Sequence, residues 1–441
     1  MAPGQGSVAI LRLSGPRSEA IGRLLFRVAG RQEWESHRVL YGHVVDPASG
    51  DRVDEALLLL MRAPRSFTRE DVVEFHCHGG LEAVRRVQEL VVAAGARPAG
   101  PGEFSQRAFL NGRLDLTRAE AVVEMINARS RRAAALAMAG LDGGLQRRIS
   151  ALRQQLLDPL AELEARLDFE EDLPPLHPAA ITDALVAVRA ALEQLVREAR
   201  QGQLLREGLR VAIVGRPNVG KSSLLNRLSQ RERAIVTDLP GTTRDLLESE
   251  LVLEGVPLTL LDTAGIRPSD DPVERLGIAR SKEALAAADA VLLLFDLGSG
   301  WTVADAELRA LVPEGVPLLV VGNKADLCPP PGSPAAAGIA DVAISVRTGA
   351  GIDDLVQQLL ARCGATDLGG LQVALNARQR DLAAAAAAAV ARSLEAAADG
   401  LPWDFWTIDL RQAVRSLGEI TGEEVSEAVL DRVFARFCIG K

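Results

Sequence analysis

The chain has 441 residues, with 50 basic against 59 acidic side chains and a formal net charge of −9. Its length predicts about three domains of ordinary size, and 48% hydrophobic with 25% charged residues excludes a globally disordered chain. A pI near 5.3 argues against a broad basic coat for nucleic acid, although it is compatible with a local basic patch.

The first region, residues 1–112, mixes short apolar runs with one amphipathic stretch. The runs at 8–13, 56–61 and 72–75 predict strands, and the stretch at 81–94 predicts a helix. Connections rich in glycine and proline separate them, as at 97–102. We expect an α/β or α+β domain over residues 1–112.

The second region is helical and interrupted. Apolar residues recur at three- and four-residue spacing from Ala119 to Ile126, and leucines do so from Leu152 to Leu167. An alanine run at 383–389 predicts a thin packed helix. Trp403 and Trp406, further along, are expected to be part of a helical core or packing anchors. Residues 113–205 and 371–441 are therefore expected to form one discontinuous all-α domain.

Between these helical parts, residues 206–370 alternate short strands with helices. The strands are expected at 210–214, 258–261, 290–295, 318–321 and 343–346. This rhythm indicates a parallel sheet covered by helices. A complete α/β domain is thus inserted into the helical one.

The inserted domain opens with a phosphate-binding motif. Residues 215–222 read Gly-Arg-Pro-Asn-Val-Gly-Lys-Ser, after an apolar strand and before a helical segment. Backbone N–H groups in such a loop wrap phosphates at a helix N-terminus. The Lys221 ammonium then reaches the β- and γ-phosphate oxygens, and the Ser222 hydroxyl ligates Mg²⁺.

Three further motifs follow at the ends of later predicted strands. Asp262 in the Asp-Thr-Ala-Gly segment 262–265 can meet Mg²⁺ through water, and the Gly265 amide can sense a γ-phosphate. Asp326, which ends the Asn-Lys-Ala-Asp segment 323–326, can accept hydrogen bonds from N1–H and the 2-amino group of guanine, which adenine lacks. The backbone of 345–347 can support the base.

Four motifs in this order predict a guanine-nucleotide site and a GTPase. The residues expected to bind GTP are Asn218, Val219, Gly220, Lys221, Ser222, Ser223, Thr237, Asp238, Leu239, Pro240, Gly241, Thr242, Thr243, Asp262, Thr263, Ala264, Gly265, Asn323, Lys324, Ala325, Asp326, Ser345, Val346 and Arg347.

The means of hydrolysis is less obvious from the residues themselves. Ile266 stands where Ras-like GTPases carry the glutamine that orients water, so help must come from elsewhere, with Asp270, Asp271 and Glu274 as candidates. Thr243 is the natural Mg²⁺ ligand of the first switch. Asn218, with loop carbonyls and a hydroxyl, could ligate a monovalent cation that supplies positive charge beside the phosphates.

Cysteine usage and the absence of apolar spans suggest a compartment. Cys77, Cys328, Cys363 and Cys438 form no CxxC pair, so neither a zinc ribbon nor a disulfide framework is indicated. Residues 1–13 lack the pattern of a leader peptide, and no apolar run reaches the ~18–20 residues that span a bilayer. We expect a protein of the reducing cytoplasm with no membrane partner.

Taken together, the motifs resemble the MnmE (TrmE) family of tRNA-modification GTPases, in the TrmE-Era-EngA-YihA-Septin-like superfamily. The resemblance covers nearly the whole chain, and its segments are 6–15, 67–80, 101–121, 211–228, 234–245, 262–279 and the ending Phe-Cys-Ile-Gly-Lys at 437–441. It implies an N-terminal α+β domain similar to tetrahydrofolate-binding domains, a discontinuous all-α domain and an inserted P-loop GTPase domain of the Ras-like α/β type.

The family resemblance also implies an activity. Such proteins are homodimers that work with the flavoprotein MnmG, as a heterotetramer, on the wobble uridine of certain tRNAs. They install an aminomethyl or carboxymethylaminomethyl group at C5 with a one-carbon tetrahydrofolate, either 5,10-methylene- or 5-formyl-tetrahydrofolate. Hydrolysis of GTP is activated by K⁺ when two GTPase domains meet.

Site residues follow from the family where its motifs match. Potassium contacts fall on Asn218, Thr237, Leu239 and Thr242, and magnesium contacts fall on Ser222 and Thr243. The water-positioning glutamate falls on Glu274, so the implied catalytic set is Glu274, Lys221 and Asn218. Folate contacts fall on Arg12, Glu74, Arg113 and Lys441, and Cys438 is either a functional thiol or a small packed residue.

Departures from the family and one rival hypothesis complete the expectations. The chain begins without the short strand that the family usually has, and Arg113 stands where a lysine is common. His76 and His78 are expected to face away from Cys77 on a strand, so the three should not share a metal ion. The rival is a ribosome-assembly GTPase that binds rRNA; it would have no use for the folate residues.

Overall fold

The computed structural model describes residues 6–169, 178–230, 248–262, 285–328, 338–365, 370–371, 373–437 and 440, with the backbone alone at 168, 169, 248 and 262. The chain divides into two compact units. The first comprises Met1–Val123, Gln146–Gln154 and Val414–Lys441, and the second comprises Glu124–Leu145 and Gln155–Ala413.

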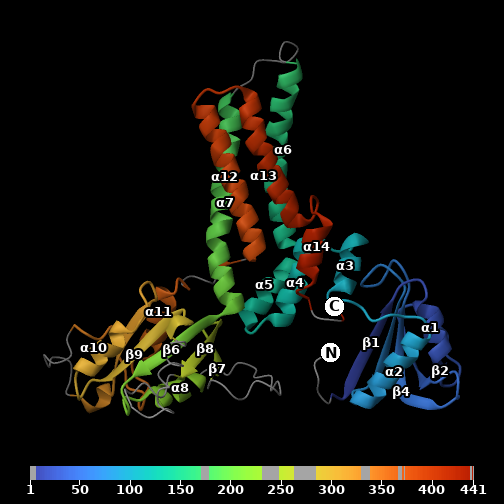
Figure 1. Cartoon of the computed structure of the whole chain (residues 1–441), viewed down its shortest axis with the longest axis horizontal. Helices are drawn as coiled ribbons and strands as arrows, with labels where there is room; N and C mark the ends of the chain where they lie inside the picture. The colour runs from blue at the N-terminus through green and yellow to red at the C-terminus, as the bar shows by residue number, and fades with distance from the viewer. Residues whose placement is uncertain are drawn as a thin grey trace. The chain divides into compact units, whose positions relative to one another are not determined.

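The first unit contains a five-stranded antiparallel sheet in the order β1-β5-β4-β3-β2. Its strands are β1 (Val8–Ser14), β2 (Phe26–Val28), β3 (Arg38–Val45), β4 (Arg52–Met61) and β5 (Val72–His78). Helices α1 (Ser18–Leu25) and α2 (Leu81–Ala93) cover one face and share a core with it (Figure 1). Strands β1, β4 and β5 and helix α2 confirm the sequence predictions, whereas β2, β3 and α1 were not predicted.

A small helical core completes this unit. Helix α3 (Glu103–Leu110), the start of α4 (Leu116–Asn127) and α14 (Glu427–Phe434) enclose Leu116, Phe434 and Phe437. Gly102 precedes α3 with φ 66°, and a Cβ there would lie 2.6 Å from the Phe434 carbonyl oxygen. The residue must therefore be glycine for the packing of α14.

Long helices occupy part of the second unit. The helical segments are α5 (Arg131–Leu141), α6 (Gly144–Phe169), α7 (Pro178–Glu207), α12 (Ala377–Ala398) and α13 (Trp403–Thr421), of which α6 and α13 also contribute residues to the first unit. Helices α7 and α12 lie side by side (Figure 1). Alanines such as Ala383 and Ala386 on α12 are fully buried, so the alanine run is a packed helix as predicted.

The second unit also holds a six-stranded sheet in the order β11-β10-β9-β6-β8-β7. The strands are β6 (Leu209–Gly215), β7 (Glu248–Leu253), β8 (Val256–Asp262), β9 (Ala290–Asp296), β10 (Leu318–Asn323) and β11 (Val342–Ala343), and the helices are α8 (Lys221–Ser229), α10 (Val303–Ala310) and α11 (Ile352–Arg362). All neighbours are parallel except β7, which pairs antiparallel with β8.

Two details of this sheet differ from the sequence prediction. Strand β11 has only two residues, because Ser345 leaves the ladder and bonds within its own turn, where its amide donates to the Ala350 carbonyl. The antiparallel strand β7 was not predicted, since its residues 248–253 read Glu-Ser-Glu-Leu-Val-Leu and contain an apolar run of only three residues. The remaining strands confirm the predicted parallel sheet.

Candidate functional site

The loop after β6 has the backbone of a phosphate cradle. Asn218 and Gly220 have φ values of 64° and 103°, and Gly215 has φ 154°. A Cβ at Gly215 would collide with the Leu294 carbonyl, and one at Gly220 would collide with the Asn323 side-chain amide. Both positions therefore require glycine, and the loop runs directly into the N-terminus of α8, where anions are favoured.

Lys221 opens α8 and turns back over this loop. Its ammonium donates to the carbonyl oxygens of Gly215 at 2.7 Å and Arg216 at 2.9 Å. Ser222 and Ser223 follow with exposed side chains. The loop thus gathers one ammonium and two hydroxyl-bearing residues at the helix start, a donor set that fits phosphate oxygens and a hard cation.

A second contact, not found by sequence reasoning, anchors the start of the loop. The Arg216 guanidinium donates from Nε to Oδ1 of Asp305 at 2.8 Å, and Asp305 is fully buried. The other carboxylate oxygen accepts from the Thr302 amide and hydroxyl in the capping box of α10. The loop is therefore fixed to the start of a neighbouring helix.

Asn323 ties three of the predicted motifs together. It lies at the end of β10 and is 2% exposed. Its Nδ2 donates to the Val219 carbonyl at 2.7 Å, and its Oδ1 accepts from the Val346 amide at 3.1 Å. Residues from the phosphate loop, the Asn-Lys-Ala-Asp segment and the Ser-Val-Arg segment thus meet at one side chain.

Lys324 bonds to a carboxylate that the motifs did not include. Its backbone is left-handed at φ 66°, and its ammonium lies 2.8 Å from Oδ2 of Asp296. Burial works against ionisation of Asp296, but the Lys324 ammonium and the Gly298 N–H outweigh it, so its pKa is lowered. Asp296 ends β9 and so lies at the edge of the sheet where the other motifs also follow strand ends. That position is the signal by which sequence reasoning could have included it.

The predicted guanine-reading carboxylate is held from two sides. Ser345 donates its hydroxyl to Oδ1 of Asp326, and the Arg347 guanidinium lies 2.8 Å from Oδ2. The Ser345 hydroxyl, together with Arg347, lowers the pKa of Asp326. A fixed, ionised carboxylate at this point can accept two parallel N–H groups, as a guanine edge offers.

Several predicted site residues lie outside the described residues. These are Thr237, Asp238, Leu239, Pro240, Gly241, Thr242, Thr243, Thr263, Ala264, Gly265, Glu274, Cys438 and Lys441, together with the side chain of Asp262. The structure places the backbone of Asp262 at the end of β8, which pairs with β6 so that Asp262 lies beside Ile213.

A second cluster lies in the first unit, on the sheet face that α1 and α2 leave open. Nε of Arg12 on β1 lies 2.6 Å from Oε1 of Glu74 on β5, and the two residues pair directly in the ladder. The Arg12 guanidinium is 5.7 Å from the centroid of the Phe67 ring, and the Arg113 guanidinium is 5.4 Å from the same centroid. Three of the four predicted folate residues are therefore close together.

Sequence reasoning missed several neighbours in this cluster. His76 Nε2 lies 3.2 Å from the second carboxylate oxygen of Glu74, and Phe104 lies 5.7 Å from the Arg12 guanidinium. Residues 74 and 76 share a face of β5, which the two-residue period could have indicated. Cys77 points into the core on the opposite face, where burial raises the pKa of its thiol to about 12.

Comparison with known proteins identifies the family. A model described as the MnmE helical domain matches residues 116–438, and one described as the GTP-binding protein TrmE N-terminus matches residues 1–113. The chain belongs to the MnmE family. A relative named tRNA modification GTPase MnmE, from Synechococcus sp. (strain RCC307), is 70% identical over 442 residues that cover 100% of this chain and 96% of the relative.

Other MnmE relatives are similar over the same length. One from Prochlorococcus marinus (strain MIT 9303), also named tRNA modification GTPase MnmE, is 64% identical. The match spans 100% of this chain and 96% of the relative. A crystal structure of a variant of Aquifex aeolicus Era bound to GDP and AlF4⁻ is 28% identical in sequence, and the match spans 41% of this chain and 66% of the Era chain. Its TM-score of 0.29 is too low to bear on the fold.

The rest of the described chain adds two negative findings. No helix within the described residues is long and apolar enough to cross a membrane. Among those same residues, no three His, Cys, Asp or Glu side chains are grouped so that they could hold a metal ion.

Proposed function

We propose that this member of the MnmE family is a K⁺-activated GTPase that acts in tRNA wobble-uridine modification. Together with the flavoprotein MnmG, it would install an aminomethyl or carboxymethylaminomethyl group at C5 of the uridine, with the carbon supplied by a tetrahydrofolate. The division into residues 1–112, 113–205 with 371–441, and 206–370 is part of this proposal.

The observation that carries the GTPase proposal is the meeting of three motifs at Asn323. A buried amide that joins the Val219 carbonyl to the Val346 amide sets the phosphate loop at a fixed position from the Asp326 carboxylate. A nucleotide is bound at both its ends by such an arrangement. Lys221 would hold the β- and γ-phosphates, Asp326 the guanine edge, and Ser222 with Thr243 the Mg²⁺ ion.

The cation step is proposed for Asn218, with Thr237, Leu239 and Thr242 as further ligands and Glu274 positioning the water. Asn218 lies in the phosphate loop with a left-handed backbone. A bound K⁺ would supply the positive charge that an arginine supplies in other GTPases. GTP turnover should then fall by about 10²-fold when Na⁺ replaces K⁺.

Steady-state hydrolysis in the two salts tests this step. Asn218→Ala should bring the two rates together, whereas Asn226→Ala, one turn into α8, should leave the ratio as in the wild type. Equal rates for the wild-type protein in K⁺ and Na⁺ would contradict the cation mechanism.

Folate binding is proposed for Arg12, Glu74, Arg113 and Lys441. The supporting geometry is a pair of guanidinium groups around Phe67 beside a carboxylate that is 9% exposed. Glu74 can bind the aminopyrimidinone edge of a pterin, and the cations suit glutamyl carboxylates. Phe437, packed in the same unit, lies four residues before Lys441.

Titration of the full-length protein with 5-formyl-tetrahydrofolate tests the folate site. Loss of a charge-assisted contact in Arg12→Ala should weaken binding by about tenfold or more. Arg27→Ala, which removes an exposed arginine from the same unit, should not. A wild-type protein that binds no folate would favour the rival rRNA-binding function.

A homodimer is proposed through the open face of the first sheet. Val8, Ile10, Val39, Tyr41 and Leu57 lie on that face, each between 43% and 61% exposed. An apolar surface of this extent on a sheet is typical of an interface. Ile10→Arg should shift the protein toward monomer in sedimentation, whereas Leu24→Arg, on the exposed side of α1, should leave the dimer intact.

The modification itself is tested on tRNA. Nucleoside analysis of tRNA from cells that lack this protein should show wobble uridines without the C5 group, and re-expression of the wild-type chain should restore it. Lys221→Ala should fail to restore it, because hydrolysis is expected to drive the cycle. Unchanged nucleosides in the deleted cells would refute the proposed function.

A further inference from the structure

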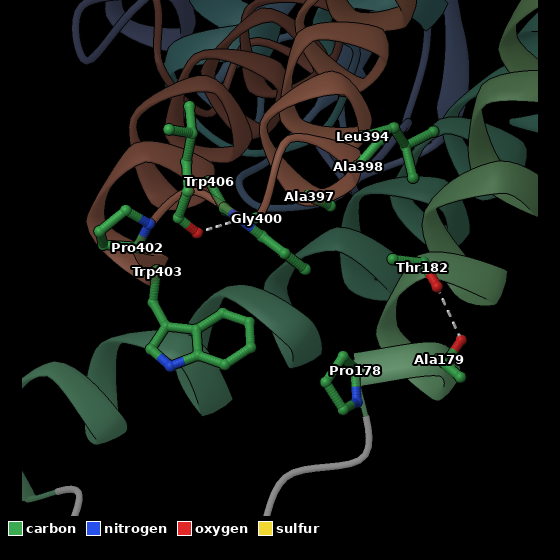
Figure 2. Close-up of a pocket in the computed structure, with 11 residues that line it drawn as sticks. Pro178, Ala179, Thr182, Leu394, Ala397, Ala398, Gly400, Pro402, Trp403 and Trp406 are labelled. Carbon is green, nitrogen blue, oxygen red and sulfur yellow. Dashed lines mark hydrogen bonds between the residues drawn. The ribbon is translucent and has the colours of Figure 1, made fainter.

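A cavity lies at one end of the helical part of the second unit. It is formed where α7 begins, where α12 ends and where α13 begins, and its volume is about 650 Å³ (Figure 2). The turn 400–402 connects α12 to α13 along its edge. A volume of this size accommodates one or two large side chains of a partner or a small ligand.

The walls of this cavity are apolar, and most of their polar side-chain atoms are already bonded. Of the lining side chains, only Thr182, Trp403 and Trp406 carry a polar atom. The Thr182 hydroxyl donates to the Ala179 carbonyl at 3.0 Å, and the Trp406 indole N–H donates to the Leu401 carbonyl at 3.2 Å. The cavity therefore offers shape and apolar surface rather than a set of hydrogen bonds, so it selects an apolar occupant.

Two tryptophans give the cavity a rigid wall. The rings of Trp403 and Trp406 pack edge to face, with centroids 4.8 Å apart and planes at 72°. Trp406 is 3% exposed, and Ser393 on α12 donates its hydroxyl to the Trp406 carbonyl at 3.3 Å. Aromatic side chains held in this way are favourable anchors for a partner's aliphatic or aromatic group, because little entropy is lost when they are covered.

Four acidic residues stand next to lining residues in the chain. Asp183, Glu395, Asp399 and Asp404 each directly follow a lining residue, and all four are exposed. Within the described part of the chain, none of the four takes part in an ion pair. Arg392, which lies three residues before Glu395 in α12, is paired with Asp409. Each of the four carboxylates thus lies one residue along the chain from the lining, and none has a described cation as its partner.

We propose that this cavity is a docking site for a protein segment that presents an apolar anchor flanked by lysines or arginines, as on one face of an amphipathic helix. The apolar walls take the anchor, and the acidic border attracts the basic flanks. Nucleic acid is disfavoured here, because its phosphates would meet four like charges. The site lies apart from the nucleotide motifs and does not depend on GTP hydrolysis.

Peptide binding to the full-length protein tests the proposal. Three labelled helical peptides with the same pattern serve as probes. The first has leucine anchors with lysine flanks, the second has serine in place of leucine, and the third has glutamate in place of lysine. The leucine–lysine peptide should bind at least about tenfold more tightly than either of the others, since each of those lacks one half of the match. If the serine–lysine peptide bound as tightly as the leucine–lysine peptide, charge alone would account for binding, and the proposal would be overturned.

Variants locate the binding. Ala398→Trp places a large ring at an exposed wall position and should weaken the leucine–lysine peptide about tenfold. Asp399→Lys with Asp404→Lys should reverse the preference toward the leucine–glutamate peptide. The matched control, Asp51→Lys with Glu314→Lys, changes the net charge equally at exposed positions elsewhere and should leave the preference unchanged.

Two outcomes of the variant series would refute the docking site. One is an equal loss of peptide binding in the control pair, which would mean that any surface carboxylate serves. The other is binding of an RNA duplex that disappears in Ala398→Trp, which would place nucleic acid in the cavity. Circular dichroism of each variant separates both outcomes from misfolding.

Discussion

The two candidate sites are built in different ways. The nucleotide site forms at one edge of a parallel sheet, where loops following β6, β10 and β11 meet, and backbone groups supply much of it. The Arg12–Glu74 cluster forms on the open face of an antiparallel sheet, from side chains 62 residues apart in the chain. The first site depends on local backbone geometry, and the second depends on the register between strands.

This difference decides how each site responds to mutation. In the nucleotide site, the glycines and Asn323 fix the backbone of the loops, and a few charged side chains would contact the nucleotide. In the first unit, the charges themselves hold the strands and loops, because Arg12, Glu74 and Arg113 contact one another or Phe67 directly. We therefore expect the removal of a charged side chain to affect activity more than stability in the nucleotide site, and stability more than activity around Glu74.

The largest expected effect is on catalysis at Lys221. Lys221→Ala removes the ammonium that would neutralise the phosphates, and GTP turnover should fall by about 10²–10³-fold. The thermal unfolding of the protein should change little, because the ammonium is partly exposed and bonds to the loop carbonyls of Gly215 and Arg216. Single-turnover hydrolysis measures the first effect and calorimetry the second.

A matched control for this variant exists in the chain. Lys282→Ala removes a lysine that no motif contains, and it should retain wild-type turnover. If Lys221→Ala hydrolysed GTP at the wild-type rate, the assignment of the phosphate loop would be wrong.

Asn323 is expected to affect both shape and stability. Asn323→Leu keeps the volume but leaves the buried Val219 carbonyl and the Val346 amide without their partner. Two orphaned backbone groups should cost about 2–3 kcal/mol in the free energy of unfolding. Urea denaturation measures this cost. Nucleotide affinity should fall as well, because the phosphate loop is no longer bonded to the segments expected to bind the guanine base.

Asn226→Leu provides the comparison for Asn323. It makes the same chemical change on α8 at a side chain that joins no motifs, and it should cost less than about 1 kcal/mol. Equal destabilisation by both changes would mean that the bridge through Asn323 contributes nothing specific.

The sequence predicted these two sites to different extents. The phosphate loop and the Asn-Lys-Ala-Asp segment are contiguous, so the strand ends that position them could be inferred from local apolar runs. Asp296 and Asp305 were missed because each lies far along the chain from its partner, Lys324 or Arg216. The strand end at Asp296 and the capping box at Asp305 are local signals, but neither indicates that partner. Glu74 entered only through the family resemblance, since a single carboxylate on a strand has no distinctive pattern.

The register between β1 and β5 explains why the Arg12–Glu74 cluster could be seen only in the folded structure. Arg12 faces Glu74 because Leu13 faces Val73 and Leu11 faces Phe75 on the buried side. A shift of one residue would separate the pair and expose the core. No property of either segment alone specifies that alignment, whereas the turn and helix signals of the phosphate loop are local.

Stability around Glu74 should depend on its arginine. Among the described residues, Arg12→Met leaves the 9% exposed Glu74 carboxylate with His76 as its partner. The free energy of unfolding should fall by about 1–2 kcal/mol, less than for a fully buried pair because Arg12 is 27% exposed. Adding Glu74→Gln should recover part of this loss. A double-mutant cycle by urea denaturation gives the coupling, and a coupling near zero would contradict the role assigned to the pair.

The smallest expected effect is the acid sensitivity of the first unit. In the first unit, the Arg97 guanidinium, with the Gly100 N–H and Arg107, lowers the pKa of Glu103 from 4.5 to about 2, although burial opposes the shift. Arg62 is the main cause of a similar lowering of the pKa of Glu19 to about 2. The stability from these carboxylates is fully present above pH 4.5 and is lost as the pH falls toward 2.

Unfolding followed between pH 5 and pH 2 tests this acid sensitivity. In the wild-type protein, probes in the first unit, such as Trp34, should report a loss of stability across that window. In Glu103→Gln the pH slope should be shallower, because the substituted side chain cannot release a proton in either state, and Glu82→Gln on exposed α2 should change the slope less. If the slope were the same in Glu103→Gln and in the wild type, the ion pairs of Glu103 would not be the source of acid sensitivity, and the proposed reliance of this unit on side-chain charge would fail.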